Sequence, residues 1–174
     1  KRNRSLTAFA PDHSRNLSGT GKVAVVTLSD TRTEKNDTAG DIIVELATKS
    51  GHQIVKRTLL KEDPQQITDA VQQLAIDPSV EVILMTGGTG ISRRDNTYEI
   101  IAGMLTRQMP GYGELFRTLS YQEIGPAAML SRAQAGLLEQ TLLFTMPGSP
   151  GAVRLAMEKL ILPELGHLLQ ESQR

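Results

Sequence analysis

The sequence of 174 residues contains no cysteine and no tryptophan, and aromatic residues make up only 3% of it. A chain without cysteine forms neither a disulfide framework nor a thiolate metal site, and it suits a reducing compartment. So few aromatic side chains argue against a broad surface for stacking nucleic-acid bases. A hydrophobic run long enough to cross a membrane is also missing. We therefore expect a cytoplasmic protein that binds neither nucleic acid nor a membrane.

Net charge is absent as well, because 19 basic residues balance 19 acidic ones. This balance disfavours a nucleic-acid binder, which usually has an excess of basic residues. The charge is unevenly placed, since residues 1–22 hold five basic residues and one acidic residue. That segment also lacks hydrophobic periodicity, so we predict a flexible basic N-terminal arm over residues 1–21 and one folded domain over residues 22–174.

The first half of the folded domain alternates between strand and helix patterns. Two runs, 22–28 and 80–86, are apolar almost throughout, as in strands that are buried on both faces. The expected order is strand 22–28, helix 41–51, strand 53–60, helix 62–77 and strand 80–86. Alternation of this kind predicts an α/β fold with a mostly parallel sheet.

The helix expected over 62–77 has a clear start signal. Asp63 is placed to cap its N-terminus, Pro64 suits the first helical position, and Gln66 completes a capping box. Apolar residues then recur at helical spacing, which gives the helix one buried face.

The second half predicts further helices and a short hairpin. Asn96 and Glu99 are suited to cap a helix that begins at Thr97. Pro163 should bend the last helix. The expected elements are a helix from 97 to about 106, a short helix within 109–120, a hairpin of strands 134–138 and 141–146, and a helix over 152–169.

The strongest local signal is the sequence TGGTG directly after a buried strand. Small residues let backbone N–H groups approach an anion closely, and threonine hydroxyls add further donors. A tight turn is the alternative, but three glycines and two threonines exceed what a turn needs. We predict phosphate binding by Thr86, Gly87, Gly88, Thr89 and Gly90.

Carboxylates accompany this loop. Asp95 lies just before a helix start, where it either stabilises the helix end or binds Mg²⁺ beside phosphates. Ligands of parallel sheets bind beyond the carboxyl ends of the strands. If strands 22–28 and 80–86 are neighbours, the candidates for ligand binding also include Ser29, Asp30 and Asp37. The alternative for each is an ordinary polar residue of a loop.

Two further segments are candidates for phosphate contacts. Gly148 and Ser149 offer donors where a strand ends and a helix begins, and a simple turn is the equal alternative. Ser131 and Arg132 are suited to a further phosphate contact, which their spacing alone does not establish.

Taken together, these blocks resemble the MoaB/MogA family of molybdenum cofactor biosynthesis proteins, and the MoaB-like branch in particular. The likeness extends from Lys22 to Leu169. Several separated motifs in the same order make a chance similarity improbable. They are VVTLSDTR, TGGTGISRRDNT, MPGYGELFR, LSR at 130–132 and MPGSP at 146–150.

The resemblance implies a three-layer α/β/α sandwich that binds molybdopterin. It also implies an adenylyltransferase that transfers AMP from Mg-ATP to the terminal phosphate of molybdopterin and releases pyrophosphate. Asp95 matches the family's catalytic aspartate, and the second catalytic carboxylate falls on Glu62, where the family has aspartate. Both would bind Mg²⁺. The resemblance further implies a homo-oligomer, with a hexamer as the first expectation and a trimer as the second. It also suggests the downstream metal-insertion protein as a partner.

Two other functions stay open at this point. One is a non-catalytic molybdopterin-binding oligomer of the same pathway, because glutamate replaces aspartate at position 62. The other is an unrelated α/β nucleotide-binding protein. Turnover with Mg-ATP and molybdopterin separates the adenylyltransferase from the non-catalytic oligomer. Failure to bind any pterin would favour the unrelated nucleotide-binding protein.

Overall fold

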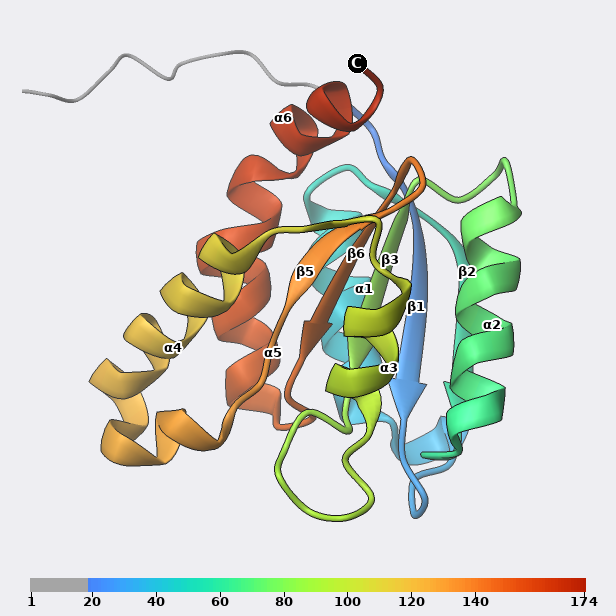
Figure 1. Ribbon diagram of the computed structural model, residues 1–174. Coiled ribbons are helices and arrows are strands. Elements are labelled where there is room, and N and C mark those ends of the chain that lie inside the picture. Colours follow the sequence, from blue (N-terminus) through green and yellow to red (C-terminus); the bar gives the residue numbers. More distant parts are fainter. Residues whose placement is uncertain (1–18) are drawn as a thin grey trace, which may run out of the picture.

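A computed structural model describes residues 19–174 as a six-stranded sheet with helices on both faces (Figure 1). This architecture confirms the three-layer α/β/α sandwich with a mostly parallel sheet and a short hairpin. The predicted arm falls largely on residues 1–18, which lie outside the described residues. Its last residue, Gly21, is buried, and its N–H donates to Nδ1 of His52 at 3.1 Å.

The strand order across the sheet is β2-β1-β3-β6-β5-β4. The first four of these strands are parallel, whereas β5 runs antiparallel to both β6 and β4. All five predicted strands match to within two residues at each end, and the hairpin is the β5–β6 pair. The bounds are β1 Lys22–Leu28, β2 Gln53–Leu60, β3 Val82–Thr86, β4 Arg107–Gln108, β5 Ala135–Leu138 and β6 Thr141–Met146.

The helices divide between the two faces of the sheet. Helices α2 and α3 cover one face, and α1, α4, α5 and α6 cover the other (Figure 1). Their bounds are α1 Thr38–Lys49, α2 Pro64–Ile76, α3 Thr97–Met104, α4 Pro110–Ile124, α5 Pro150–Ala156 and α6 Leu162–Ser172. Short 3-10 helices occupy Glu34–Asn36 and Gly125–Leu130.

Strand β3 shows why the sheet is buried on both sides. Val82 and Leu84 point into the core beneath α1, α4 and α5, whereas Ile83 and Met85 point into the core beneath α2 and α3. Successive side chains of a strand alternate between faces, so an all-apolar strand requires a cover on each face. The helices therefore leave only the ends of the central strands for a binding site.

Three predictions about helices need correction. The last helix is not α-helical throughout, because a π-helical turn, Met157–Ile161, lies between α5 and α6 just before the turn that contains Pro163. Proline lacks an N–H group and its ring clashes with the preceding turn, and a wider turn accommodates both effects. Helix α1 begins at Thr38 rather than at residue 41, because the Asp37 side chain caps it by accepting from the Gly40 N–H.

The third correction concerns the start of α3. The Asn96 side chain makes no capping hydrogen bond there. Glu99 instead pairs with Arg132, which comes from a distant part of the chain. An ion pair to a guanidinium is a stronger attraction than a hydrogen bond to one backbone N–H group, so Glu99 turns toward Arg132. Within residues 19–174, none of the helices is long and apolar enough to cross a membrane.

The predicted cap of α2 is confirmed and gives a stability test. The Asp63 carboxylate accepts from the Gln66 N–H at 2.9 Å. Asp63→Ala should lower the free energy of unfolding by about 1 kcal/mol, because it leaves a helix-end N–H group without its partner. Asp69→Ala, on the exposed side of the same helix, should change it by less than about 0.5 kcal/mol. Urea unfolding of both variants measures the difference, and equal losses would contradict a capping role.

Candidate functional site

The candidate site lies at the carboxyl ends of the central strands. Strand β1 pairs directly with β3, and β3 pairs with β6, all in parallel. This pairing meets the condition on which Ser29 and Asp30 were made candidates. The loops that follow these three strands gather at the lower edge of the molecule in Figure 1. The loops after β3 and β6 line a cavity of about 280 Å³.

The cavity collects predicted residues from three separate segments of the chain. The loop after β3 contributes Gly88, Thr89, Gly90 and Asp95, and the loop after β6 contributes Gly148 and Ser149. Ser131 lines the cavity from the segment before β5. An apolar wall that the sequence analysis did not predict completes it, formed by Phe116, Ile124, Ala127, Leu130 and Ala152.

The loop after β3 has a backbone that only glycine tolerates at two positions. Gly87 and Gly88 have φ angles of 105° and 64°, in the left-handed region. A Cβ atom at Gly87 would overlap the Leu28 carbonyl, and one at Gly88 would overlap the Thr97 hydroxyl. The glycines therefore allow the loop to fold tightly over β1 and α3, which turns residues 88–90 into the cavity wall.

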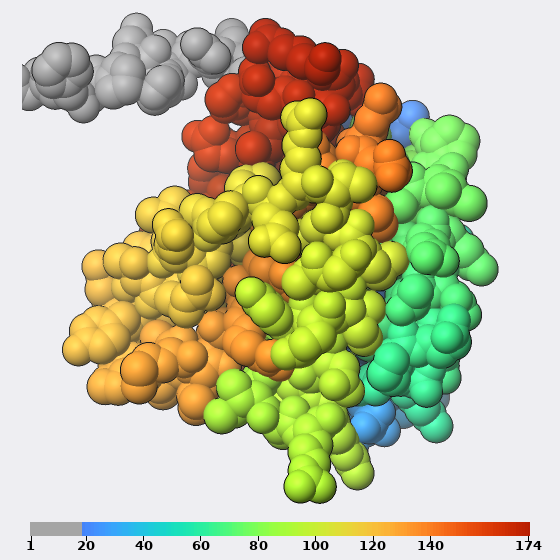
Figure 2. Space-filling model, viewed as in Figure 1, coloured from blue at the N-terminus to red at the C-terminus, as the bar shows by residue number. Residues whose placement is uncertain are grey.

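Three carboxylates from three loops approach one another beside the cavity. The Asp95 Oδ2 accepts from the Ser92 N–H at 2.8 Å, and Asp30 accepts from the Glu62 N–H at 3.1 Å. Arg94 pairs with Asp30 at 3.4 Å. In Figure 2 the loop after β3 projects at the lower edge of the molecule, beside the blue surface of the segment after β1.

The surroundings of Glu62 disfavour its negative charge. Partial burial of Glu62, followed by the negative charges of Asp95 and Asp30, raises the pKa of the Glu62 carboxyl, and Arg94 only partly opposes this. Within residues 19–174, no three His, Cys, Asp or Glu side chains are arranged to hold a metal ion as a set. Mg²⁺ usually needs only one or two carboxylates when substrate phosphates supply the other oxygens. Glu62 and Asp95 therefore suit a cation that binds together with a phosphate substrate.

Among the polar side chains of the cavity wall, Ser131 points most directly to a bound ligand. Its Oγ atom is buried and has no hydrogen-bond partner within the described part of the chain. A buried hydroxyl without a partner is unfavourable, so a bound ligand would stabilise it. Ser149, in contrast, already accepts from the Ala152 N–H at 3.3 Å and caps α5.

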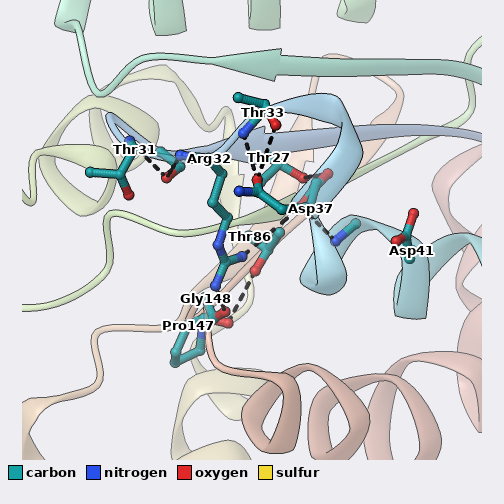
Figure 3. Close-up of polar contacts among 12 residues, drawn as sticks. Thr27, Thr31, Arg32, Thr33, Asp37, Asp41, Thr86, Pro147 and Gly148 are labelled. Carbon is teal, nitrogen blue, oxygen red and sulfur yellow. Dashed lines mark hydrogen bonds and ion pairs between the residues drawn. The ribbon is translucent and has the colours of Figure 1, made fainter.

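A buried charged network supports the loop after β6 (Figure 3). Arg32 donates to the Gly148 carbonyl at 3.0 Å and approaches Asp37, which is bonded in turn to Thr27 and Arg57. Burial alone would raise the pKa of Asp37, but hydrogen bonds from the Gly40 N–H and Arg57 outweigh it and lower the pKa. Asp37 is therefore a structural anchor beneath the site.

Three of the predicted ligand contacts form hydrogen bonds within the protein. Thr86 is buried and its hydroxyl donates to the Pro147 carbonyl at 3.1 Å, which joins the ends of β3 and β6 (Figure 3). Arg132 donates to the backbone carbonyls of Gly90 and Asp95. The hydroxyl of Ser29 accepts from the N–H groups of Thr31 and Arg32, which shapes the turn after β1.

Comparison with known proteins identifies the family. A family model described as "Probable molybdopterin binding domain" matches residues 24–167. The chain belongs to the MoaB/MogA family. Its role is in molybdenum cofactor biosynthesis, as the resemblance predicted.

Relatives of the MoaB-like branch match over most of their length. Molybdenum cofactor biosynthesis protein B of Bacillus cereus is 48% identical over 151 residues, which cover 86% of this chain and 89% of that protein. A crystal structure of a molybdenum cofactor biosynthesis protein B has 46% identity and a TM-score of 0.87, and covers 90% of this chain and 98% of its own. The tungsten cofactor synthesizing protein MoaB from Pyrococcus furiosus has 34% identity and a TM-score of 0.81, with coverages of 89% and 98%.

The raised pKa of Glu62 predicts a pH-dependent stability penalty. The folded protein holds this proton more tightly than the unfolded chain, so the free energy of unfolding falls as the pH rises from the ordinary value of 4.5 through the raised pKa. Glu62→Gln removes the penalty. It should therefore raise the Tm at about pH 7.5 more than at about pH 4, where Glu62 is largely protonated in both states.

Differential scanning calorimetry at the two pH values measures this effect. Glu123→Gln, on the exposed surface of α4, is the control and should shift the Tm equally at both. An equal gain for Glu62→Gln at both pH values would show that its charge is not the source of the penalty.

Proposed function

We propose that this protein is a molybdopterin adenylyltransferase. In this reaction an oxygen of the terminal phosphate of molybdopterin attacks the α-phosphorus of ATP. A new bond between the two phosphates forms, the bond to the β-phosphate breaks, and pyrophosphate leaves. The products are adenylylated molybdopterin and pyrophosphate.

The observation that carries the proposal is the composition of the 280 Å³ cavity. One side offers the glycine-threonine loop and the unpartnered Ser131 hydroxyl, which suit phosphate oxygens. Another part of the lining is the apolar wall of α4, its following 3-10 helix and α5, which suits a flat ring system. Molybdopterin combines a heterocyclic ring system with one terminal phosphate, so it suits both the apolar and the polar part of the lining.

The residues around the cavity also suit the transfer itself. Phosphoryl-type transfer needs mainly positioning and neutralisation of charge, with little covalent chemistry from the protein. Asp95 and Glu62 would hold Mg²⁺, which supplies charge neutralisation at the phosphates when it is bound with ATP. The Gly88, Thr89 and Gly90 backbone would orient the phosphate that reacts.

The first test is a neutral replacement of Asp95. Asp95→Asn keeps the size and the hydrogen bond from the Ser92 N–H but removes the negative charge. The initial rate of adenylylation with purified molybdopterin and saturating Mg-ATP should fall on the order of 10²-fold or more, because the charge acts where phosphate charge is redistributed. Asp69→Asn, on the exposed side of α2, should keep the native rate.

Three outcomes of that assay are informative. A near-native rate for Asp95→Asn would remove its catalytic role. If the native protein binds molybdopterin without turnover, the alternative function is favoured, a non-catalytic molybdopterin-binding protein. The glutamate at position 62 is the reason to test this alternative. Failure to bind any pterin would overturn the whole proposal.

We further propose that the protein forms a closed homo-oligomer. A hexamer is the first expectation and a trimer is the second. Helix α4 and the following 3-10 helix expose Tyr121, Ile124 and Met129 at 60%, 59% and 78% of their surface. Clusters of large exposed apolar side chains commonly mark contact surfaces between proteins. A second copy of this chain would cover them in a symmetric assembly.

Light scattering tests this assembly. The native protein should have a mass of several times 19.0 kDa, whereas Met129→Glu and Tyr121→Glu should each shift it toward the monomer. Ile76→Glu is the matched control, because Ile76 is 79% exposed on α2, on the other side of the sheet. A native mass near 19.0 kDa at micromolar concentration would contradict the proposal.

A further inference from the structure

Arg132 makes an unusual set of contacts with the loop after β3. Its Nε atom donates to the Gly90 carbonyl at 2.8 Å, and its Nη2 atom donates to the Asp95 carbonyl at 2.7 Å. Its own backbone N–H donates to the Thr89 carbonyl at 3.1 Å. One residue therefore contacts both ends of the segment 89–95, including the residue that carries the proposed catalytic carboxylate.

That segment has few other connections to the rest of the protein. Its remaining backbone hydrogen bonds are internal, such as those from Asp95 to Ser92 and from Asn96 to Arg94. Within residues 19–174, its only other hydrogen bond to a distant element joins Arg94 to Asp30 at 3.4 Å, and the Arg94 side chain is 78% exposed. An exposed ion pair stabilises little, so Arg132 is the main anchor of the segment.

Arg132 is itself held in a fixed orientation. Its Nη1 atom pairs with the Glu99 carboxylate, and the guanidinium carbon lies 5.2 Å from the centre of the Tyr98 ring. Gln134 then donates to the Tyr98 carbonyl at 2.7 Å, which joins the same strand segment to α3. The Arg132 side chain is only 24% exposed. Its planar guanidinium is thus locked between α3 and the loop.

These contacts leave little of the guanidinium for a substrate. Three of the five N–H donors of an arginine side chain are engaged here, on the Gly90 and Asp95 carbonyls and on Glu99. Arg132 does not line the cavity, and of its two neighbours in the chain only Ser131 does. From the sequence, Arg132 was a candidate for a phosphate contact, and the geometry favours a different role.

We propose that Arg132 is a positioning residue that fixes the segment 89–95, so that the Asp95 carboxylate and the loop backbone face the cavity, without itself binding phosphate. This inference rests on the proposed function for its kinetic consequence. Its structural consequence, a fixed loop, is independent of any reaction. A displacement of about 1 Å in such a loop is enough to lower a rate on the order of 10²-fold.

Two substitutions test the role. Arg132→Gln removes the guanidinium, and Arg132→Lys keeps the positive charge but cannot donate to two carbonyls in a fixed fork. Both should lower kcat on the order of 10²-fold while KM for each substrate changes less than about threefold. Backbone amides of residues 89–97 should exchange with deuterium faster in both variants.

Two further variants serve as controls. Arg117→Gln removes an arginine that donates at 3.5 Å to the Ala133 carbonyl, next to Arg132, but makes no hydrogen bond to the segment 89–95. It should leave kcat and the exchange of residues 89–97 unchanged. Glu99→Gln keeps the carbonyl contacts of Arg132 and removes its ionic partner, so its loss should be smaller. It also tests the role if the Arg132 variants fail to fold.

The outcomes distinguish this inference from the proposed function. A loss that falls on KM and is restored by Arg132→Lys would identify a phosphate ligand and overturn the positioning role. Native exchange of residues 89–97 in both Arg132 variants would also overturn it. If the native protein shows no turnover, the proposed function fails, and the exchange measurement still decides whether Arg132 holds the loop.

Discussion

Parallel pairing of β1 with β3 and of β3 with β6 is the constraint on which the whole site depends. Their side chains are buried on both faces, so the helices that cover them leave only the strand ends open. Parallel strands end at the same edge of a sheet, which brings three loops together there. The cavity, the glycine turns and the carboxylates all follow from that register.

The residues at this edge divide into those that hold the site and those that remain open to a ligand. Thr86 and Arg132 direct their polar atoms to backbone carbonyls. Ser131 and Glu62 are different, because one has a buried hydroxyl without a partner and the other a carboxyl whose charge is disfavoured. Groups that are poorly satisfied in the free protein are the ones a charged ligand can satisfy.

Much of this arrangement was predictable from the sequence because it depends on local patterns. The apolar runs of β1 and β3 and the cap of α2 at Asp63 are such patterns, and the adjacency rule for parallel sheets then placed the loops together. The two residues of β4, Arg107–Gln108, are both exposed, so no hydrophobic pattern marks them. Their strand exists only because β5 lies beside them.

The roles of individual polar side chains were harder to predict. Arg132 lies 42 positions from Gly90 in the sequence, and only the folded chain brings its guanidinium to that carbonyl. The same holds for Glu99, whose local pattern suggested a cap but whose partner is Arg132. A charged group selects its partner by distance in space and by burial, and neither is visible in a local motif.

The buried Asp37 network has a consequence for any attempt to exchange loops between members of this family. Arg32, in the loop after β1, holds the Gly148 carbonyl in the loop after β6, and Asp37 links Arg32 to Arg57 on β2. Transplanting only one of these segments would leave a buried carboxylate or a carbonyl without its counterpart. The two loops and the middle of β2 therefore depend on one another, and a chimaera should take all three from the same parent protein.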